Sequence, residues 1–213
     1  MRSFGHQETL EEKRARARRV ISFLRKRDPQ PKIALRYGNP VQLLVAVILS
    51  AQCTDKKVNE ITGPLFRKYK TAWDFARARQ LVLEREIHAC GFFRAKARNI
   101  IAACRMIEKD FGGKVPRTMD EILQLPGVAR KTANVVLGNA YGVVEGIAVD
   151  THMIRLNRKL GFTRHTDPKK IERDLMRIIP RRDWFVYTHL VINYARAHCP
   201  ARHKECDGTI YKI

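Results

Sequence analysis

The sequence has no apolar segment long enough to cross a membrane. Its longest apolar stretch, residues 41–51, has about 11 residues and includes Gln42 and Ser50, whereas a membrane-spanning helix needs about 20 apolar residues. The N-terminal segment also lacks the apolar core of a secretory signal. We therefore expect an intracellular protein without membrane contact, in the cytoplasm or nucleoid if the source is prokaryotic.

Cysteines and acidic residues are both few. The five cysteines are an odd number and do not suggest a disulfide scaffold. The 21 acidic residues face 42 lysines and arginines, which gives a net charge of +21, and the excess is spread along the chain. A compact protein of this charge is expected to bind a polyanion, and nucleic acid is the first candidate. A general basic bias of the organism's proteins would give the same composition.

Alternating runs of β-branched residues, which would indicate strands, are absent as well. Helical spacing of apolar residues recurs instead, so we predict an all-α protein. Residues 41–49 are nearly all apolar and should form a buried central helix. Thr118 and Glu121 have the spacing of a capping box that starts a short helix. The other predicted helices cover residues 10–27, 55–69, 73–83, 95–111, 130–139, 150–160, 167–180 and 183–196.

A very short turn precedes the predicted helix over residues 130–139. Its sequence, residues 125–129, is Leu-Pro-Gly-Val-Ala, in which Gly127 can adopt the positive φ of a tight turn. Such a turn presents backbone N–H groups that bind phosphate at the start of the next helix, where Arg130 and Thr132 lie. The segment resembles a helix-hairpin-helix motif, although an ordinary corner between helices would look similar. The usual second glycine is Ala129 here, which disfavours positive φ.

Four blocks in order carry a more specific resemblance. They are Leu-Ser-Ala-Gln-Cys-Thr-Asp at residues 49–55, Gly-Phe-Phe-Arg-Ala-Lys-Ala at 91–97, the hairpin with its following helix at 125–137, and Ile-Ala-Val-Asp-Thr-His at 147–152. Together they resemble the endonuclease III family of helix-hairpin-helix DNA glycosylases, and the resemblance runs from about residue 15 to residue 206.

The resemblance implies a two-lobed fold, with a six-helix barrel over residues 33–147 and a second helical lobe from residues 1–32 and 148–213. It implies base-excision DNA repair by a bifunctional N-glycosylase that removes oxidised pyrimidines and cleaves abasic sites by β-elimination. The expected partner is double-stranded DNA that contains damaged bases or abasic sites, bound by a monomer. A glycosylase for mismatched bases and a non-catalytic DNA-binding protein are the alternatives.

The resemblance assigns catalysis to Lys131 as nucleophile and to Asp150 as its carboxylate partner. The assignment is chemically sound because a lysine amine can attack C1′ of the sugar and form a Schiff base, while a carboxylate can accept the proton. A monofunctional relative would lack the lysine at this position. The plainer alternatives are a solvated basic residue for Lys131 and a helix N-cap for Asp150, and an N-cap is compatible with catalysis.

Two further residues would open the duplex, because a base inside the stack cannot be reached. By resemblance, Gln52 fills the space of the extruded base and Phe92 wedges the opposite strand. A polar residue at a helix end is the alternative for Gln52. Core packing is the alternative for Phe92, since burial is the commoner fate of a phenylalanine.

The family carries a 4Fe-4S cluster on four cysteines, and this chain matches that pattern only in part. Cys199 and Cys206 have the spacing of the first two ligands, but the third position is Thr209 and the sequence stops at Ile213. Two cysteines cannot hold a four-iron cluster in the usual way, so we expect no intact cluster. An altered C-terminus, a cluster-free member of the family, or another metal such as zinc bound with His198 and His203 all remain open.

Overall fold

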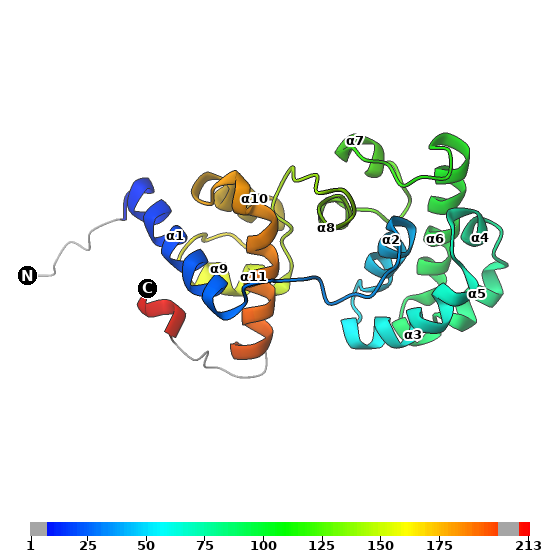
Figure 1. Cartoon of the computed structure of the whole chain (residues 1–213), viewed down its shortest axis with the longest axis horizontal. Coiled ribbons are helices and arrows are strands. Elements are labelled where there is room, and N and C mark those ends of the chain that lie inside the picture. Colours follow the sequence, from blue (N-terminus) through cyan, green and yellow to red (C-terminus); the bar gives the residue numbers. More distant parts are fainter. Residues whose placement is uncertain (1–7, 200–208) are drawn as a thin grey trace, which may run out of the picture. The chain divides into compact units, whose positions relative to one another are not determined.

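The computed structural model describes residues 8–199 and 209–213, and this part of the chain contains helices and no strand (Figure 1). The predicted all-α class is confirmed. None of the described helices is both long and apolar enough to cross a membrane. The α-helices are α1 (Leu10–Arg27), α2 (Pro40–Leu49), α3 (Asp55–Lys68), α4 (Ala72–Ala76), α5 (Gln80–Glu86), α6 (Phe93–Asp110), α7 (Met119–Ile122), α8 (Arg130–Tyr141), α9 (Thr151–Lys159), α10 (Pro168–Ile178) and α11 (Trp184–His198).

The chain forms two compact units. The central unit is Ile33–Glu145 and holds α2 to α8. The terminal unit combines Met1–Lys32 with Gly146–Ile213 and holds α1 and α9 to α11. Short 3-10 helices at His88–Cys90, Arg181–Asp183 and Thr209–Lys212 complete the described elements. Each unit has its own cluster of buried apolar side chains.

The central unit is built around α2, whose residues 41–49 are all buried. Pro40 occupies the first turn and the Asn39 side chain accepts a hydrogen bond from the Gln42 N–H, so the helix starts sharply. Helices α3, α6 and α8 pack against it. The predicted buried central helix is confirmed, and it fixes the position of the helices that surround it.

The predicted single helix over residues 73–83 is wrong, because the structure has two short helices, α4 and α5. Arg79 lies between them in an extended conformation, with φ of −70° and ψ of 120°. The Arg105 guanidinium of α6 donates to the Ala76 carbonyl at 3.0 Å, which satisfies the end of α4. One contact at the break thus comes from a residue far along the chain, which the local apolar pattern does not show.

The terminal unit is organised by a buried tyrosine. Tyr187 of α11 is fully buried and donates its hydroxyl hydrogen to Asn157 Oδ1 at 2.5 Å. The Asn157 amide in turn donates to the Met153 carbonyl at 2.9 Å, so α11 holds α9 from inside the core. An ion pair between Arg25 and Asp183 at 2.8 Å joins α1 to the start of α11. These contacts fix the helix that follows Asp150.

We expect acid to destabilise the terminal unit through His189. This side chain is buried and packs edge-on against Phe185 at 4.8 Å, and its burial lowers its pKa from the usual 6.5, opposed in part by Asp28. Below about pH 6.5 the unfolded chain binds a proton that the folded chain resists, so stability falls as the pH falls. His189→Gln should therefore shrink the loss of Tm between about pH 7.5 and about pH 5, measured by thermal unfolding. The same loss in His189→Gln as in wild type would contradict this, and His165→Gln, at an exposed histidine, is the control.

Candidate DNA-binding and active site

The hairpin lies between α7 and α8 in the central unit. Gly127 has φ of +81°, which confirms the predicted positive φ, and the Val128 N–H closes the turn on the Leu125 carbonyl at 3.1 Å. Space is restricted there as well, because a Cβ atom added to Gly127 would lie 2.9 Å from Asn99 Cβ of α6. Glycine is therefore needed for two reasons, the backbone conformation and the close approach of α6.

The start of α8 has no side-chain cap, which suits its first backbone N–H groups to phosphate. Helices α5, α6 and α11 also start without a side-chain cap bond. Asparagine, threonine or aspartate side chains cap α2, α3, α9 and α10, whereas the N-cap of α8 is Ala129, which has no polar side chain. Ala129 is extended, with φ of −96°, so the absent second glycine costs nothing at this position. Backbone N–H groups of an uncapped first turn, together with the helix dipole, suit an anion.

Lys131 is the second residue of α8 and its side chain is exposed. The helix that carries it is held in the core of the central unit by Ala133, Val136 and Leu137, each fully buried. Arg130 and Thr132, on either side of the lysine, are half-buried. The structure thus places an accessible amine on a rigid helix, directly beside the hairpin.

Asp150 is the N-cap of α9 in the terminal unit, which confirms the predicted helix N-cap at this residue. Its Oδ1 accepts a hydrogen bond from the Met153 N–H at 2.9 Å, and the side chain is half-buried. The buried residues Ile147, Ala148 and Val149 lead into it. The carboxylate is therefore fixed by both its backbone and its cap. Lys131 belongs to the central unit and Asp150 to the terminal unit. Their cooperation in catalysis is therefore a proposal, which experiment can test.

Gln52 and Phe92 share an uncommon backbone conformation. Both have positive φ, 53° for Gln52 and 46° for Phe92, and they are the two non-glycine residues of the described chain that do. Both side chains are exposed, Phe92 to 67%. Core packing of Phe92 is therefore wrong as an alternative. Sequence reasoning could not show this conformation, since glutamine and phenylalanine rarely adopt it.

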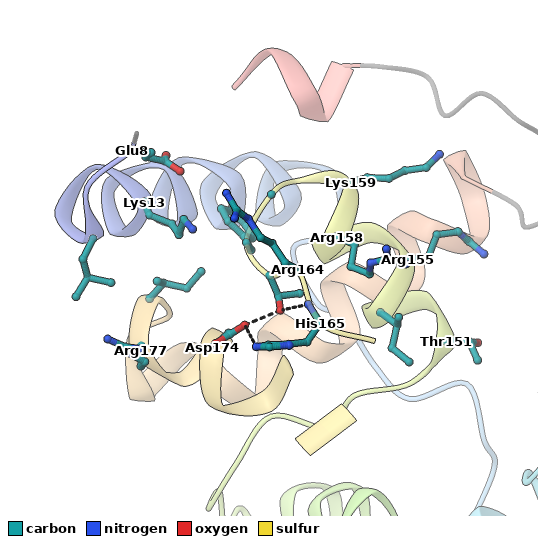
Figure 2. Close-up of a pocket in the computed structure, with 16 residues that line it drawn as sticks. Glu8, Lys13, Thr151, Arg155, Arg158, Lys159, Arg164, His165, Asp174 and Arg177 are labelled. Atoms are coloured by element: carbon teal, nitrogen blue, oxygen red, sulfur yellow. Dashed lines mark hydrogen bonds and ion pairs between the residues drawn. The ribbon is translucent and has the colours of Figure 1, made fainter. Parts of the chain in front are cut away.

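A wide basic pocket of about 1530 Å³, which sequence reasoning missed, lies in the terminal unit beside Thr151 (Figure 2). Its two acidic side chains are paired: Glu8 binds Arg16 at 2.7 and 2.8 Å, which lowers the Glu8 pKa, and Asp174 accepts from the Thr163 hydroxyl at 2.5 Å. This charge suits the phosphates of a backbone better than an uncharged base. The basic residues of the pocket are Lys13, Arg155, Arg158, Lys159, Arg164 and Arg177.

The described residues do not fit the cluster of four cysteines. Cys199 is the C-cap of α11, and the Arg155 guanidinium donates to its carbonyl. Thr209, at the third ligand position, carries a hydroxyl that cannot replace a thiolate in such a cluster. No three His, Cys, Asp or Glu side chains within residues 8–199 and 209–213 could hold a metal ion. Cys206 and His203 lie outside the described residues.

Comparison with known proteins identifies the family of this chain. Residues 45–181 match the family described as "HhH-GPD superfamily base excision DNA repair protein". A Synechocystis protein named endonuclease III is 50% identical over 194 residues, which cover 91% of this chain and 89% of that protein. The chain belongs to the endonuclease III family.

Solved structures of endonuclease III with DNA agree with this assignment and confirm the resemblance predicted from the four sequence blocks. A trapped covalent intermediate of endonuclease III with DNA is 43% identical, with a TM-score of 0.85 over 89% of each chain. A non-covalent endonuclease III–DNA complex is 42% identical, with a TM-score of 0.89 over 94% of each chain.

The hairpin predicts a specific effect of Gly127→Ala. The new methyl group must tolerate a positive φ and also displace Asn99, so we expect a loss of about 1–3 kcal/mol in unfolding free energy and weaker binding to duplex DNA. Gly142→Ala is the matched control, because Gly142 has φ of +67° but nothing within 4 Å of an added Cβ. Urea unfolding and fluorescence anisotropy would measure the two effects. Equal losses in both variants would show that the contact with α6 is unimportant.

Proposed function

We propose that this member of the endonuclease III family is a bifunctional DNA N-glycosylase with abasic-site lyase activity. The observation that carries the proposal is the placement of Lys131, an exposed amine in the first turn of α8, next to an uncapped helix start suited to phosphate. An amine held beside the sugar-phosphate backbone is positioned to attack a sugar carbon. The trapped covalent intermediate known for a relative supports the same chemistry.

The reaction follows from the two side chains. Lys131 Nζ attacks C1′ of the damaged nucleotide, and the bond from C1′ to the base breaks as the base leaves with the electron pair. Asp150 accepts the proton that the attacking amine gives up and stabilises the positive charge that develops on the sugar. The C1′–O4′ bond then breaks as O4′ takes up a proton, which opens the sugar ring and leaves a Schiff base between C1′ and Nζ. This Schiff base makes the C2′ hydrogen acidic. Its loss expels the phosphate on the 3′ side, which cleaves the strand, and water then releases the lysine.

The proposed substrates are oxidised pyrimidines in double-stranded DNA, together with abasic sites. The shared sequence blocks with endonuclease III glycosylases support this substrate class, and the basic pocket of the terminal unit supports contact with a phosphate backbone (Figure 2). Gln52 would fill the space of the extruded base while Phe92 stacks against the opposite strand. We propose that the protein acts as a monomer inside the cell, where this substrate is found.

The endonuclease III family generally carries a 4Fe-4S cluster, and we infer that this chain holds no intact one. Thr209 at the third ligand position supports this inference, because a hydroxyl cannot replace a thiolate in such a cluster. The proposed chemistry uses only the lysine amine and the carboxylate, so no step of it depends on the cluster.

Borohydride trapping tests the nucleophile. Wild-type protein incubated with a duplex that contains thymine glycol should give a covalent adduct on addition of borohydride, because the reagent reduces the Schiff base to a stable amine. Lys131→Ala should give no adduct and should not nick abasic DNA, while its non-specific DNA binding persists. Lys56→Ala is the matched control, since Lys56 is an exposed lysine at the second position of α3.

The outcomes separate the alternative functions. Nicking of abasic DNA by Lys131→Ala at the wild-type rate would exclude Lys131 as the nucleophile. Base release without an adduct from the wild type would indicate a monofunctional glycosylase, such as one for mismatched bases. DNA binding with neither base release nor adduct would indicate a non-catalytic DNA-binding protein.

Asp150→Asn separates the cap from the chemistry. Asparagine caps helices as well as aspartate does, so the unfolding free energy should change by less than about 0.5 kcal/mol. The single-turnover rate of base release should nevertheless fall by about 10²- to 10⁴-fold, because the amide cannot accept a proton. Asp167→Asn is the control, as Asp167 caps α10 with the same 2.9 Å bond. A wild-type rate of base release in Asp150→Asn would show that Asp150 acts only as a helix cap.

A further inference from the structure

Lys96 of α6 is a buried lysine that the proposed reaction does not use. It is 5% exposed, and its ammonium group donates to three backbone carbonyls, those of Leu49 at 2.9 Å, Ala51 at 2.7 Å and Cys90 at 2.8 Å. An ammonium group has three hydrogens, so these three hydrogen bonds to backbone carbonyls use all of its donors. Burying a charge is costly unless it is hydrogen-bonded in this way, and burial lowers the Lys96 pKa.

The three carbonyls belong to the two segments that carry Gln52 and Phe92. Leu49 is the last residue of α2 and Ala51 directly precedes Gln52. Cys90 closes the 3-10 helix that precedes Gly91 and Phe92. One ammonium group therefore joins two segments that are about 40 residues apart in the sequence, at the points where both turn into the left-handed region.

Both turns are strained, and strain of this kind needs support. A non-glycine residue at positive φ is sterically strained, and the conformation persists only where the surrounding structure determines it. Lys96 supplies that support on the N-terminal side of each strained residue. A second link runs between the same segments, where the Cys53 and Cys90 thiols contact each other. Burial raises the pKa of the Cys90 thiol to about 12.

We propose that Lys96 is a positioning residue for opening the duplex: by binding the carbonyls of Leu49, Ala51 and Cys90, it holds Gln52 and Phe92 in the exposed conformations that enter the DNA. This inference rests on the proposed function, in which these two side chains replace and flank the extruded base. With the segments already ordered in the free protein, the cost of ordering them is not incurred during base extrusion.

Lys96→Met tests the proposal, because methionine fills a similar volume without a donor. On duplex DNA with thymine glycol, single-turnover base release should slow by about tenfold to a hundredfold, as expected for misplaced positioning groups. The fluorescence rise of 2-aminopurine placed opposite the lesion should fall with it. Strand cleavage at an abasic site in single-stranded DNA, where no base is extruded, should stay within about twofold of wild type. Lys109→Met, at an exposed lysine of the same helix, is the matched control.

A double-variant cycle distinguishes positioning from a general structural role. If Lys96 acts through Gln52 and Phe92, adding Lys96→Met to a Gln52→Ala/Phe92→Ala protein should slow base release by no more than about twofold. An undiminished, multiplicative loss would overturn the proposal, as would a loss of single-strand cleavage equal to the loss on duplex. Should Lys96→Met fail to fold, Lys96→Arg keeps the buried charge but not the three-carbonyl geometry, and the same comparisons apply.

Failure of the proposed function has a separate signature. A wild-type protein that neither releases thymine glycol nor gives a trapped adduct would contradict the proposed reaction. Unimpaired base release by Gln52→Ala/Phe92→Ala would show that the two side chains do not open the duplex, and would overturn the role of Lys96 with it. Impaired release in that double variant with normal release in Lys96→Met would overturn the role of Lys96 alone.

Discussion

The burial of α2 is the constraint on which the central unit depends. Its residues 41–49 are all buried, so the helix has no free face and the helices against it, α3, α6 and α8, take their positions from it. The hairpin and Lys131 are carried by α8, and the turn with Gln52 begins where α2 ends. One apolar segment therefore positions both the hairpin with Lys131 and the turn with Gln52. The dense packing of such a core leaves little room for these features to shift.

The two helix starts that we assign to catalysis are built in opposite ways. Helix α8 begins at Ala129 without a side-chain cap, which suits its first turn to an external anion. Helix α9 begins at Asp150, whose carboxylate caps its own helix through Met153. In the proposed reaction the first start binds the backbone of DNA and presents the amine, and the second presents a carboxylate that its cap already orients. The hydrogen bond that makes Asp150 the N-cap therefore also orients its carboxylate for the proposed catalytic role.

The local sequence was sufficient to predict those features whose physical cause lies within a few residues. The apolar run of α2, the glycine of the hairpin and the cap of α9 are each determined within a few residues, and each was predictable. The end of α4 is contacted by Arg105, and the segments with Gln52 and Phe92 at positive φ are contacted by Lys96. The basic pocket is likewise lined by residues of α1, α9 and α10 (Figure 2). Such features need the tertiary structure, because their causes lie far away in the sequence.

A lysine is well matched to the place that Lys96 occupies. Three carbonyls from two segments converge there, and an ammonium group can donate in three directions, whereas a side-chain amide offers two hydrogens and a hydroxyl one. The strain at Gln52 and Phe92 is then offset during folding by hydrogen bonds and by the packing of α2 and α6, before any DNA is present. Stability and duplex opening are coupled at this point: a change that relaxed the two residues would stabilise the free protein and remove the exposed conformations that our proposal requires.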